Sequence, residues 1–278
     1  MPLSVLHDLD LESVIRTLPA APRILAQLAQ RLQSADVDID DVTHMLRRDA
    51  GLTARLIDMA NSAAFLGFES ATTIEDAVAR VGFRETHRII GAVASTQLSV
   101  QSLSIYGLSP RRVRENSLFC ALVMEDLSEC LDLDAGTAYT LGLLRSIGKV
   151  VLERVARTRV GVERFDPHRL TVNAWEQSMF GLTNAEVAAR VLELWEFPSA
   201  AVEAMRCHAM APGHSRAALL LNVSAGAAER HGLELAGERG LWRFDGQAFA
   251  ELGCDEARVD WAAERANGIL QRISPVFA

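Results

Sequence analysis

Glycine, proline and tyrosine are scarce in this chain. Its 278 residues include 18 Gly, 8 Pro and 2 Tyr. Few glycines and prolines leave few residues that interrupt a helix. The two tyrosines, and the lack of dense runs of β-branched residues, argue against an all-β fold. Alanine and leucine are abundant, and both lose little conformational freedom in a helix. The composition therefore predicts an all-α protein.

Cysteine motifs and long apolar runs are also lacking. The 4 cysteines are scattered and form no CxxC pair, so we expect reduced thiols that serve in packing. They are Cys120, Cys130, Cys207 and Cys254. No apolar run approaches the roughly 20 residues of a membrane span. Residues 1–8 lack the charged start and apolar stretch of a signal peptide. We therefore expect a cytoplasmic protein.

An excess of positive charge is absent as well. The net charge is −8, with 49% hydrophobic and 23% charged residues, which is typical of a globular protein and does not favour nucleic acid as a partner. Arginines do cluster at Arg111, Arg112 and Arg114, and again at Arg154, Arg157 and Arg159. Solvated helix ends are the simpler interpretation of both clusters. A nucleic-acid-associated regulator remains an alternative, and strong salt dependence of binding would be needed to support it.

Helical periodicity dominates what is present. Between residues 22 and 33, Ile24, Leu25, Leu28 and Leu32 recur at the spacing of one buried stripe. Asp38 or Asp40 is expected to cap the helix that carries Val42 and Leu46, and Gly82 to end a short helix that starts after Thr73. Further helices are predicted at 50–61, 84–100, 111–131, 135–144, 172–179, 184–195, 199–208, 216–231 and 256–272.

Composition changes divide the chain into three parts. A polar break at 102–110 is the clearest internal boundary, and residues 232–253 are richer in glycine. We therefore expect an N-terminal helical subdomain at 1–105, a second helical subdomain at 106–232 and a C-terminal extension at 233–278. In the extension, residues 232–253 are expected to form a loop or a small added element.

Several short motifs occur in a fixed order. They are Leu18-Pro19-Ala20-Ala21-Pro22, Asp49-Ala50-Gly51-Leu52, Asn61-Ser62, Ile74–Gly82, Leu141-Gly142-Leu143-Leu144-Arg145-Ser146-Ile147-Gly148-Lys149, Phe180–Val187 and Trp195-Glu196-Phe197-Pro198. Their order and spacing resemble the HDOD domains, which are bacterial output domains related to HD phosphohydrolases. The resemblance implies an all-α fold, in which an N-terminal helical subdomain packs on a degenerate HD-like helical bundle. Its motif positions here are Pro19, Pro22, Asp49, Asn61, Ser62 and Gly82.

The resemblance also implies where a metal would be held. In HD enzymes a His, a His-Asp pair and a later Asp bind divalent metal, which gathers anionic oxygens and activates water. Asn116 stands at the first of these positions, Arg145 and Ser146 stand at the pair, and Asn184 replaces a further His of related subgroups. Residues 219–228, where the last Asp is expected, contain no acid. We therefore predict no metal, no other cofactor and no catalytic residues.

The remaining residues could form a binding pocket in place of the metal site. The candidates are Asn116, Arg145, Ser146, Asn184 and His208. The guanidinium of Arg145 could bind a phosphate or carboxylate directly, or it could pair with a core acid such as Glu176 or Glu186. His208 is the one imidazole left of the set, and it is expected at a helix end, although a ligand-binding role stays open.

Two of the motif positions have expected structural roles. Asp49 is expected to cap the helix that begins at Ala50 or Gly51. Asn61 and Ser62 are expected to fix a turn through bonds from their side chains to the backbone, with a binding role as the alternative.

These observations together predict a non-catalytic bacterial module of signal transduction. It would act by binding a protein partner supplied in trans, or a small phosphorylated ligand such as a nucleotide or a cyclic dinucleotide. The alternative is a metal-dependent phosphohydrolase with an unconventional site, and the second alternative is the nucleic-acid-associated regulator. The sequence leaves the oligomeric state open.

Overall fold

The fold is all-α, as predicted. The structure is a computed structural model, and it describes residues 8–273 except 33, 35, 63–69, 100–101, 132 and 211–214. Within these ranges there is no strand, and an isolated bridge between Leu103 and Leu108 is the only β-type pairing. No helix in the described ranges combines the length and the apolar character needed to cross a bilayer. The 4 cysteines are free thiols.

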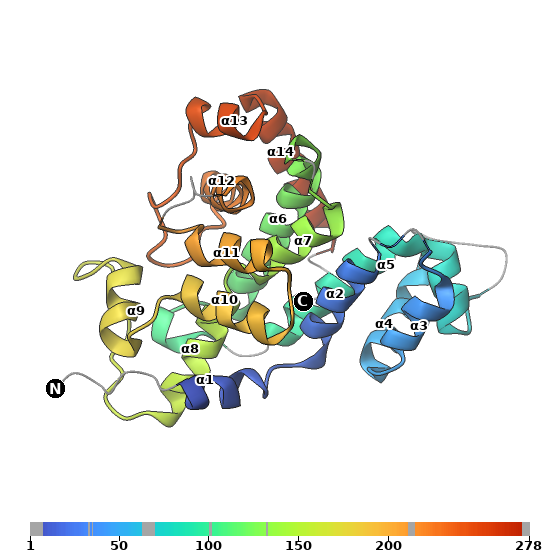
Figure 1. Cartoon of the computed structure of the whole chain (residues 1–278), viewed down its shortest axis with the longest axis horizontal. Coiled ribbons are helices and arrows are strands. Elements are labelled where there is room, and N and C mark those ends of the chain that lie inside the picture. The colour runs from blue at the N-terminus through green and yellow to red at the C-terminus, as the bar shows by residue number, and fades with distance from the viewer. Residues whose placement is uncertain are drawn as a thin grey trace. The chain divides into compact units, whose positions relative to one another are not determined.

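Two compact units make up the chain (Figure 1). One comprises residues 19–97, and the other comprises the residues up to Leu18 together with those from Leu98 onward. These bounds differ from the expected parts 1–105, 106–232 and 233–278. The first helix of the chain packs on α8, and the last helix packs on α6, so both ends of the chain belong to one unit.

In its described residues, the unit of residues 19–97 contains four helices. They are α2 (Ala20–Arg31), α3 (Ile39–Leu46), α4 (Ala50–Ala60) and α5 (Ile74–Leu98). The carboxylate of Asp38 caps α3 by accepting a hydrogen bond from Asp41 N at 2.8 Å. Asp49 caps α4 by accepting from Gly51 N and Leu52 N. Local capping therefore sets where these helices begin, as the sequence indicated.

The HDOD-like motif positions of this unit have structural roles. Pro19 occupies the N-cap position of α2, and Pro22 lies buried in its first turn. The side chain of Asn61 donates to Ala71 O at 2.9 Å and accepts from Ala71 N at 2.8 Å, which holds Asn61 beside Ala71. Ser62 N donates to Met59 O, but the Ser62 Oγ has no hydrogen-bond partner among the described residues, so the bond predicted from its side chain is not formed. Gly82 has φ +80° and interrupts α5, a conformation that glycine adopts at little cost.

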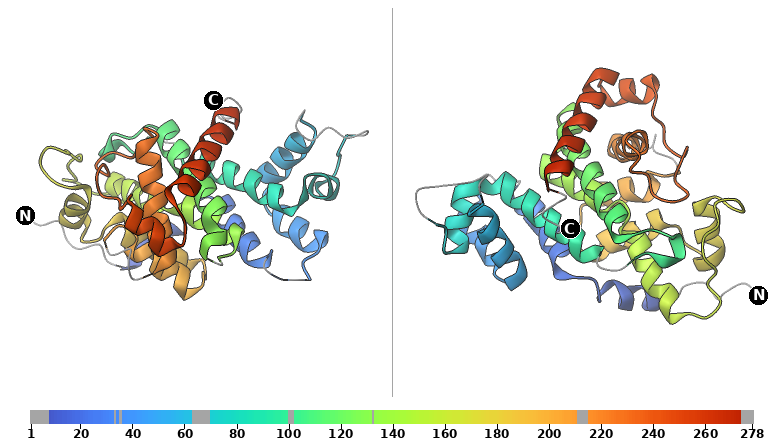
Figure 2. Two further views of the ribbon diagram at one scale, coloured as in Figure 1. Left: turned by 90° about the horizontal axis from the view of Figure 1, so that it is seen from above. Right: turned by 180° about the vertical axis from the view of Figure 1, so that it is seen from behind.

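The larger unit is a bundle around α6. Its helices are α1 (Asp8–Ile15), α6 (Pro110–Leu127), α7 (Ala135–Leu144), α8 (Ile147–Thr158), α9 (Val172–Phe180), α10 (Asn184–Leu194), α11 (Ser199–Cys207), α12 (Arg216–Arg230), α13 (Gly246–Leu252) and α14 (Glu256–Ile273). Helix α6 packs against α7, α12 and α14, and Figure 2 shows α14 along α6. Helix α10 packs against α8 and α11. From residue 116 onward α6 is buried all round, as expected of a central helix.

Among the described residues, three α-helices lie outside the ranges predicted from periodicity. Helix α1 precedes the first predicted helix, and α13 falls in the stretch 232–253, which is otherwise a loop. Helix α8 is the instructive case. Its buried face includes Lys149 and Glu153, which are 1% and 2% exposed. The apolar residues Ile147, Val150, Val151 and Val155 nevertheless recur at helical spacing, so the pattern of α8 is present in the sequence although no helix was predicted there.

Candidate functional site

The five residues predicted for the pocket come together in the larger unit. Asn116 lies on α6, Arg145 and Ser146 form the junction between α7 and α8, Asn184 opens α10, and His208 follows α11. Their exposures range from 0% to 6%, so all five are buried. The motif positions Pro19 to Gly82 belong to the other unit. The positions at which the resemblance predicts the HD metal ligands are therefore occupied by buried side chains of the bundle.

Arg145 forms its ion pair with Glu238 and not with either acid named from the sequence. Its Nη2 lies 3.0 Å from Oε2 of Glu238, and the two side chains are 1% and 3% exposed. Glu176 pairs with Lys149 instead. Glu186 forms the capping box of α10 by accepting from Thr183 N. The expectation of a core acid was right in kind, but both named partners were wrong.

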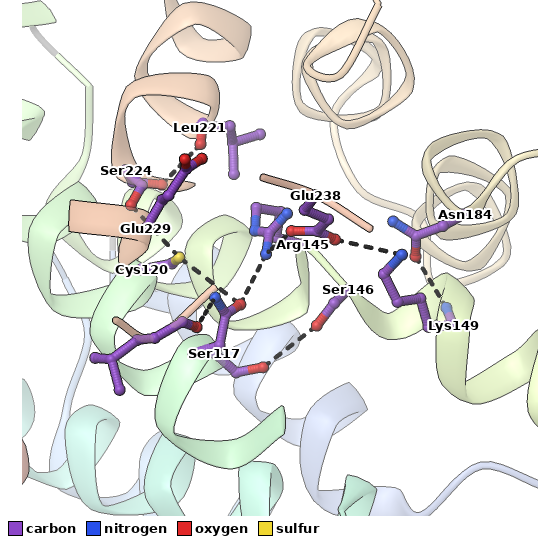
Figure 3. Close-up of polar contacts among 12 residues, drawn as sticks. Ser117, Cys120, Arg145, Ser146, Lys149, Asn184, Leu221, Ser224, Glu229 and Glu238 are labelled. Carbon is purple, nitrogen blue, oxygen red and sulfur yellow. Dashed lines mark hydrogen bonds and ion pairs between the residues drawn. The ribbon is translucent and has the colours of Figure 1, made fainter. Parts of the chain in front are cut away.

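Lys149 joins the two carboxylates into one network. Its Nζ lies 3.3 Å from Glu238 Oε1, as Figure 3 shows. The same Nζ lies 3.4 Å from Glu176 Oε1. Glu176 also accepts from Tyr106 Oη at 2.9 Å and from Asn184 N at 2.6 Å. Two cations and two carboxylates therefore balance in a site that excludes water. Buried charges need such pairing, because an unpaired one costs several kcal/mol.

The shifted pKa values agree with charged partners at the centre. Burial alone would lower the pKa of Arg145, but the Glu238 carboxylate raises it above the ordinary value. Burial alone would raise the pKa of Glu238, but Arg145 and Lys149 lower it. Burial, and then the charge of Glu176, raise the pKa of Tyr106 well above 10, so its hydroxyl stays a hydrogen-bond donor. The pair of Arg145 and Glu238 is therefore ionised at neutral pH.

Glu238 comes from a non-helical segment between α12 and α13. We call residues 233–242 the strap. Asn116 Nδ2 donates to Leu233 O at 2.9 Å, and Asn116 Oδ1 accepts from Arg145 Nη2 at 2.7 Å. Asn222, in the acid-free stretch of α12, accepts from Arg243 N just beyond the strap at 2.7 Å. The asparagines at and near former ligand positions therefore hold the strap in place.

The other two candidates, Ser146 and Asn184, connect the start of α8 to neighbouring helices. Ser146 Oγ lies 3.5 Å from Ser117 Oγ, which links the α7–α8 junction to α6. Asn184 Oδ1 accepts from Lys149 N at 2.9 Å, at the start of α8. Gly148 makes this contact possible, since a Cβ on it would lie 2.1 Å from the backbone oxygen of Asn184.

His208 is fully buried beside the network. Its Nδ1 lies 2.6 Å from Met205 O, and its ring stacks on Trp242 with centroids 6.2 Å apart. A carbonyl oxygen only accepts, so this contact requires the proton on Nδ1. Burial, and then the charge of Arg145, lower the pKa of His208 to about 4. The imidazole is therefore neutral at neutral pH and packs at the end of α11, as expected from the sequence.

The buried ion network does not fit a bound metal ion. No three His, Cys, Asp or Glu residues within the described ranges come together in a group that could hold one. Both carboxylates at the former metal position already bind the fixed cations Arg145 and Lys149. A metal ion there would meet those positive charges at short range.

The arginine clusters contact groups of the chain itself. Arg111 Nε lies 2.6 Å from Glu115, and Arg112 bonds to the carbonyl of Gly232. Arg157 Nη2 lies 3.3 Å from Glu153, and Arg154 donates to Thr17 O.

A comparison with known protein families matches this chain to one family. The HDOD domain model matches residues 18–211. The chain belongs to the HDOD domain family. An uncharacterized protein of Treponema pallidum (strain Nichols) is 25% identical over 202 residues, and the match covers 70% of this chain and 38% of that relative. The chain thus spans little more than a third of the length of that curated relative.

Solved structures of low sequence identity share the HDOD fold. An HDOD domain protein of unknown function from Geobacter sulfurreducens is 19% identical with a TM-score of 0.66, over 96% of this chain and 97% of that one. A protein of Marinobacter aquaeolei VT8, to which signal transduction is ascribed, is 20% identical with a TM-score of 0.72, over 99% and 62%. A Shewanella amazonensis SB2B protein, to which a phosphohydrolase activity is ascribed, is 23% identical with a TM-score of 0.61, over 93% of each chain.

Two important residues were not among the candidates from the sequence. Lys149 is the last residue of the motif Leu141–Lys149, but no role was predicted for it. Glu238 lies outside the HDOD match, and no local pattern relates it to Arg145. A basic residue such as Arg145, where the family pattern expects a metal ligand, indicates that an acidic side chain lies nearby. Only the folded chain shows that this acid is Glu238.

His208 should make the free energy of unfolding depend on pH between the imidazole's ordinary pKa of 6.5 and its folded pKa of about 4. Its pKa is lowered from 6.5 to about 4 in the folded state. Above pH 6.5 both states are neutral. Below it the unfolded state binds a proton that the folded state does not, so the free energy of unfolding falls as pH falls. At pH 5 we expect a loss of about 2 kcal/mol.

Urea denaturation at pH 7, 6 and 5 measures this effect. In His208→Phe, which keeps a ring beside Trp242 but cannot titrate, stability should depend less on pH across this range, whatever its value at pH 7. Equal pH dependence in the wild type and the variant would contradict the prediction.

Proposed function

We propose that this HDOD protein is a non-catalytic regulatory module of bacterial signal transduction. It works in the cytoplasm by binding a protein partner supplied in trans or a small phosphorylated ligand. The observation that carries the proposal is the ion pair between Arg145 and Glu238 at the position where an HD enzyme would hold metal. Catalysis by a metal requires an open coordination position for water or substrate. Here the position is filled by the chain's own side chains.

Metal content and hydrolysis test this proposal directly. Purified protein is incubated with Mn²⁺, Fe²⁺ or Mg²⁺ and then desalted, and its metal content is measured by inductively coupled plasma mass spectrometry. We expect less than about 0.1 metal ion per chain, because carboxylates already paired with Arg145 and Lys149 offer no vacant ligand set. The protein should hydrolyse bis(p-nitrophenyl) phosphate no faster than buffer with the same metal. Stoichiometric metal together with metal-dependent hydrolysis would refute the proposal.

A ligand screen separates the two kinds of binding. Thermal denaturation is followed with nucleotides and cyclic dinucleotides present, because a ligand that binds only the folded state raises the midpoint. A shift that Arg145→Met removes favours a phosphorylated ligand at the network. If no nucleotide shifts the midpoint, a protein partner is favoured, and capture of partners from the native bacterium is the next step.

A further inference from the structure

Two buried cations of this protein converge on one carboxylate that its own strap supplies. Arg145 and Lys149 lie 3.0 and 3.3 Å from the two oxygens of Glu238, which stands between them in Figure 3. We propose that Arg145 and Lys149 form a latent phosphate-binding site, which Glu238 of the strap keeps closed until a phosphorylated ligand displaces it. This inference rests on the proposed binding function and names the ligand class and the regulation of that site.

The buried donors of the site exceed what one carboxylate can satisfy. The Nε and Nη1 of Arg145 and the Nε1 of Trp242 are buried without a hydrogen-bond partner among the described residues. The guanidinium carbon of Arg145 lies 5.1 Å from the centre of the Trp242 ring. A phosphate offers more acceptor oxygens than a carboxylate, and a guanidinium binds both kinds of anion in the same planar manner. The donors of Arg145 and Trp242 therefore suit a larger anion than Glu238.

The strap lacks regular secondary structure and borders the surface. It has no helix, and glycines with positive φ occur just before it and within it, at Gly232, Gly237 and Gly240. Two surface depressions border it, and Gly237 and Arg239 line both of them. A third depression is lined by Arg239, Gly240 and Trp242. Solvent therefore reaches the strap on several sides while Glu238 stays 3% exposed.

The ends of the strap are tied to α12. Leu233 N donates to Ala228 O at 2.8 Å, and Arg243 N donates to Asn222 Oδ1 at 2.7 Å. Between these ties Leu235 is fully buried, and Gly237 packs against Phe165. Opening must give up the burial of Leu235, so a ligand has to bind the open state more tightly than the closed one. Free phosphate competes poorly, because Glu238 is held at a high effective concentration.

The strap also lies outside the part of the chain that the family match covers. The HDOD match ends at residue 211, before α12 and the strap begin. The cations Arg145 and Lys149 lie within the match, and the carboxylate that closes them comes from beyond it. The family match therefore gives no information about the closing contact.

Binding of pyrophosphate and inorganic phosphate tests the inference. Affinity is measured by isothermal titration calorimetry on the full chain and on Glu238→Gln, which removes the competing charge. We expect Glu238→Gln to bind pyrophosphate at least about tenfold more tightly than the wild type, which is a change of about 1.4 kcal/mol. Glu234→Gln is the matched control, because Glu234 lies on the same strap but pairs with the exposed Arg239. It should bind as the wild type does.

A second substitution places the gain at the site. Lys149→Met added to Glu238→Gln should abolish the gain in affinity. The inference is overturned if folded Glu238→Gln binds pyrophosphate no more tightly than the wild type, or if the gain survives the loss of Lys149.

Hydrogen exchange of the wild type keeps the inference testable if Glu238→Gln does not fold. Amides of residues 234–241 should exchange faster than those of α12, and saturating pyrophosphate should speed them further. Strap amides that exchange as slowly as those of α12, with and without pyrophosphate, would overturn the inference. Neither readout involves metal or hydrolysis, so a failed strap inference and a failed non-catalytic proposal give different results.

Discussion

Replacing Arg145 by methionine should lower the free energy of unfolding by about 3–5 kcal/mol. The substitution leaves the buried carboxylate of Glu238 facing Lys149 alone, and Lys149 is already shared with Glu176. The carboxylate of Glu238 is 3% exposed, so water cannot replace the lost guanidinium. Urea denaturation measures the effect, with the midpoint and the slope fitted separately.

Two further variants decide whether the loss arises from the buried pair. Arg239→Met removes an arginine that is 79% exposed and pairs with Glu234, so it should cost less than about 1 kcal/mol. The double variant Arg145→Met with Glu238→Leu should recover most of the stability, because it leaves Lys149 paired with Glu176 and no unpaired charge. A loss below about 1 kcal/mol in Arg145→Met would show that the pair does not stabilise the bundle.

Gly148→Ala should destabilise the protein by about 3 kcal/mol or more, because overpacking against backbone cannot relax cheaply. The added Cβ would lie 2.1 Å from the backbone oxygen of Asn184. Asn184 cannot easily retreat, since its N–H donates to Glu176 and its side chain accepts from Lys149 N. The clash therefore pushes α8 away from the first turn of α10 and disturbs the charge network beside it.

A second glycine provides the matched control for Gly148→Ala. Gly268 lies within α14, and a Cβ there would meet nothing within 4 Å. Gly268→Ala should raise the free energy of unfolding by up to about 1 kcal/mol, because alanine is the better helix former. Both variants are compared by urea denaturation. If Gly148→Ala is as stable as the wild type, the close approach of α8 and α10 described here is wrong.

Local chemistry explains why much of the fold could be predicted from the sequence. Asp38 and Asp49 cap the helices that follow them, and Gly82 interrupts α5 where the pattern predicted a break. Each of these features depends on residues within three or four positions of one another, so the sequence displays them directly. The same is true of the HDOD motifs and of the side chains that replace the metal ligands.

The features that could not be predicted have a different cause. Lys149 and Glu153 occupy core positions of α8, and nothing near them in the sequence indicates which groups neutralise their charges. Such positions become tolerable only when a distant group neutralises them, and Glu176 does this for Lys149. The sequence shows the charge but not its partner.

Taken alone, the sequence determined that the chain is all-α and where most helices begin and end, and its resemblance to HDOD domains implied that the HD metal ligands are absent. Only the tertiary structure decided which groups meet at those positions. Arg145 pairs with Glu238, a residue of a loop far along the chain, and Lys149 joins Glu238 to Glu176. Capping and periodicity act between neighbours in sequence, whereas a buried ion pair depends on which groups packing brings together away from water.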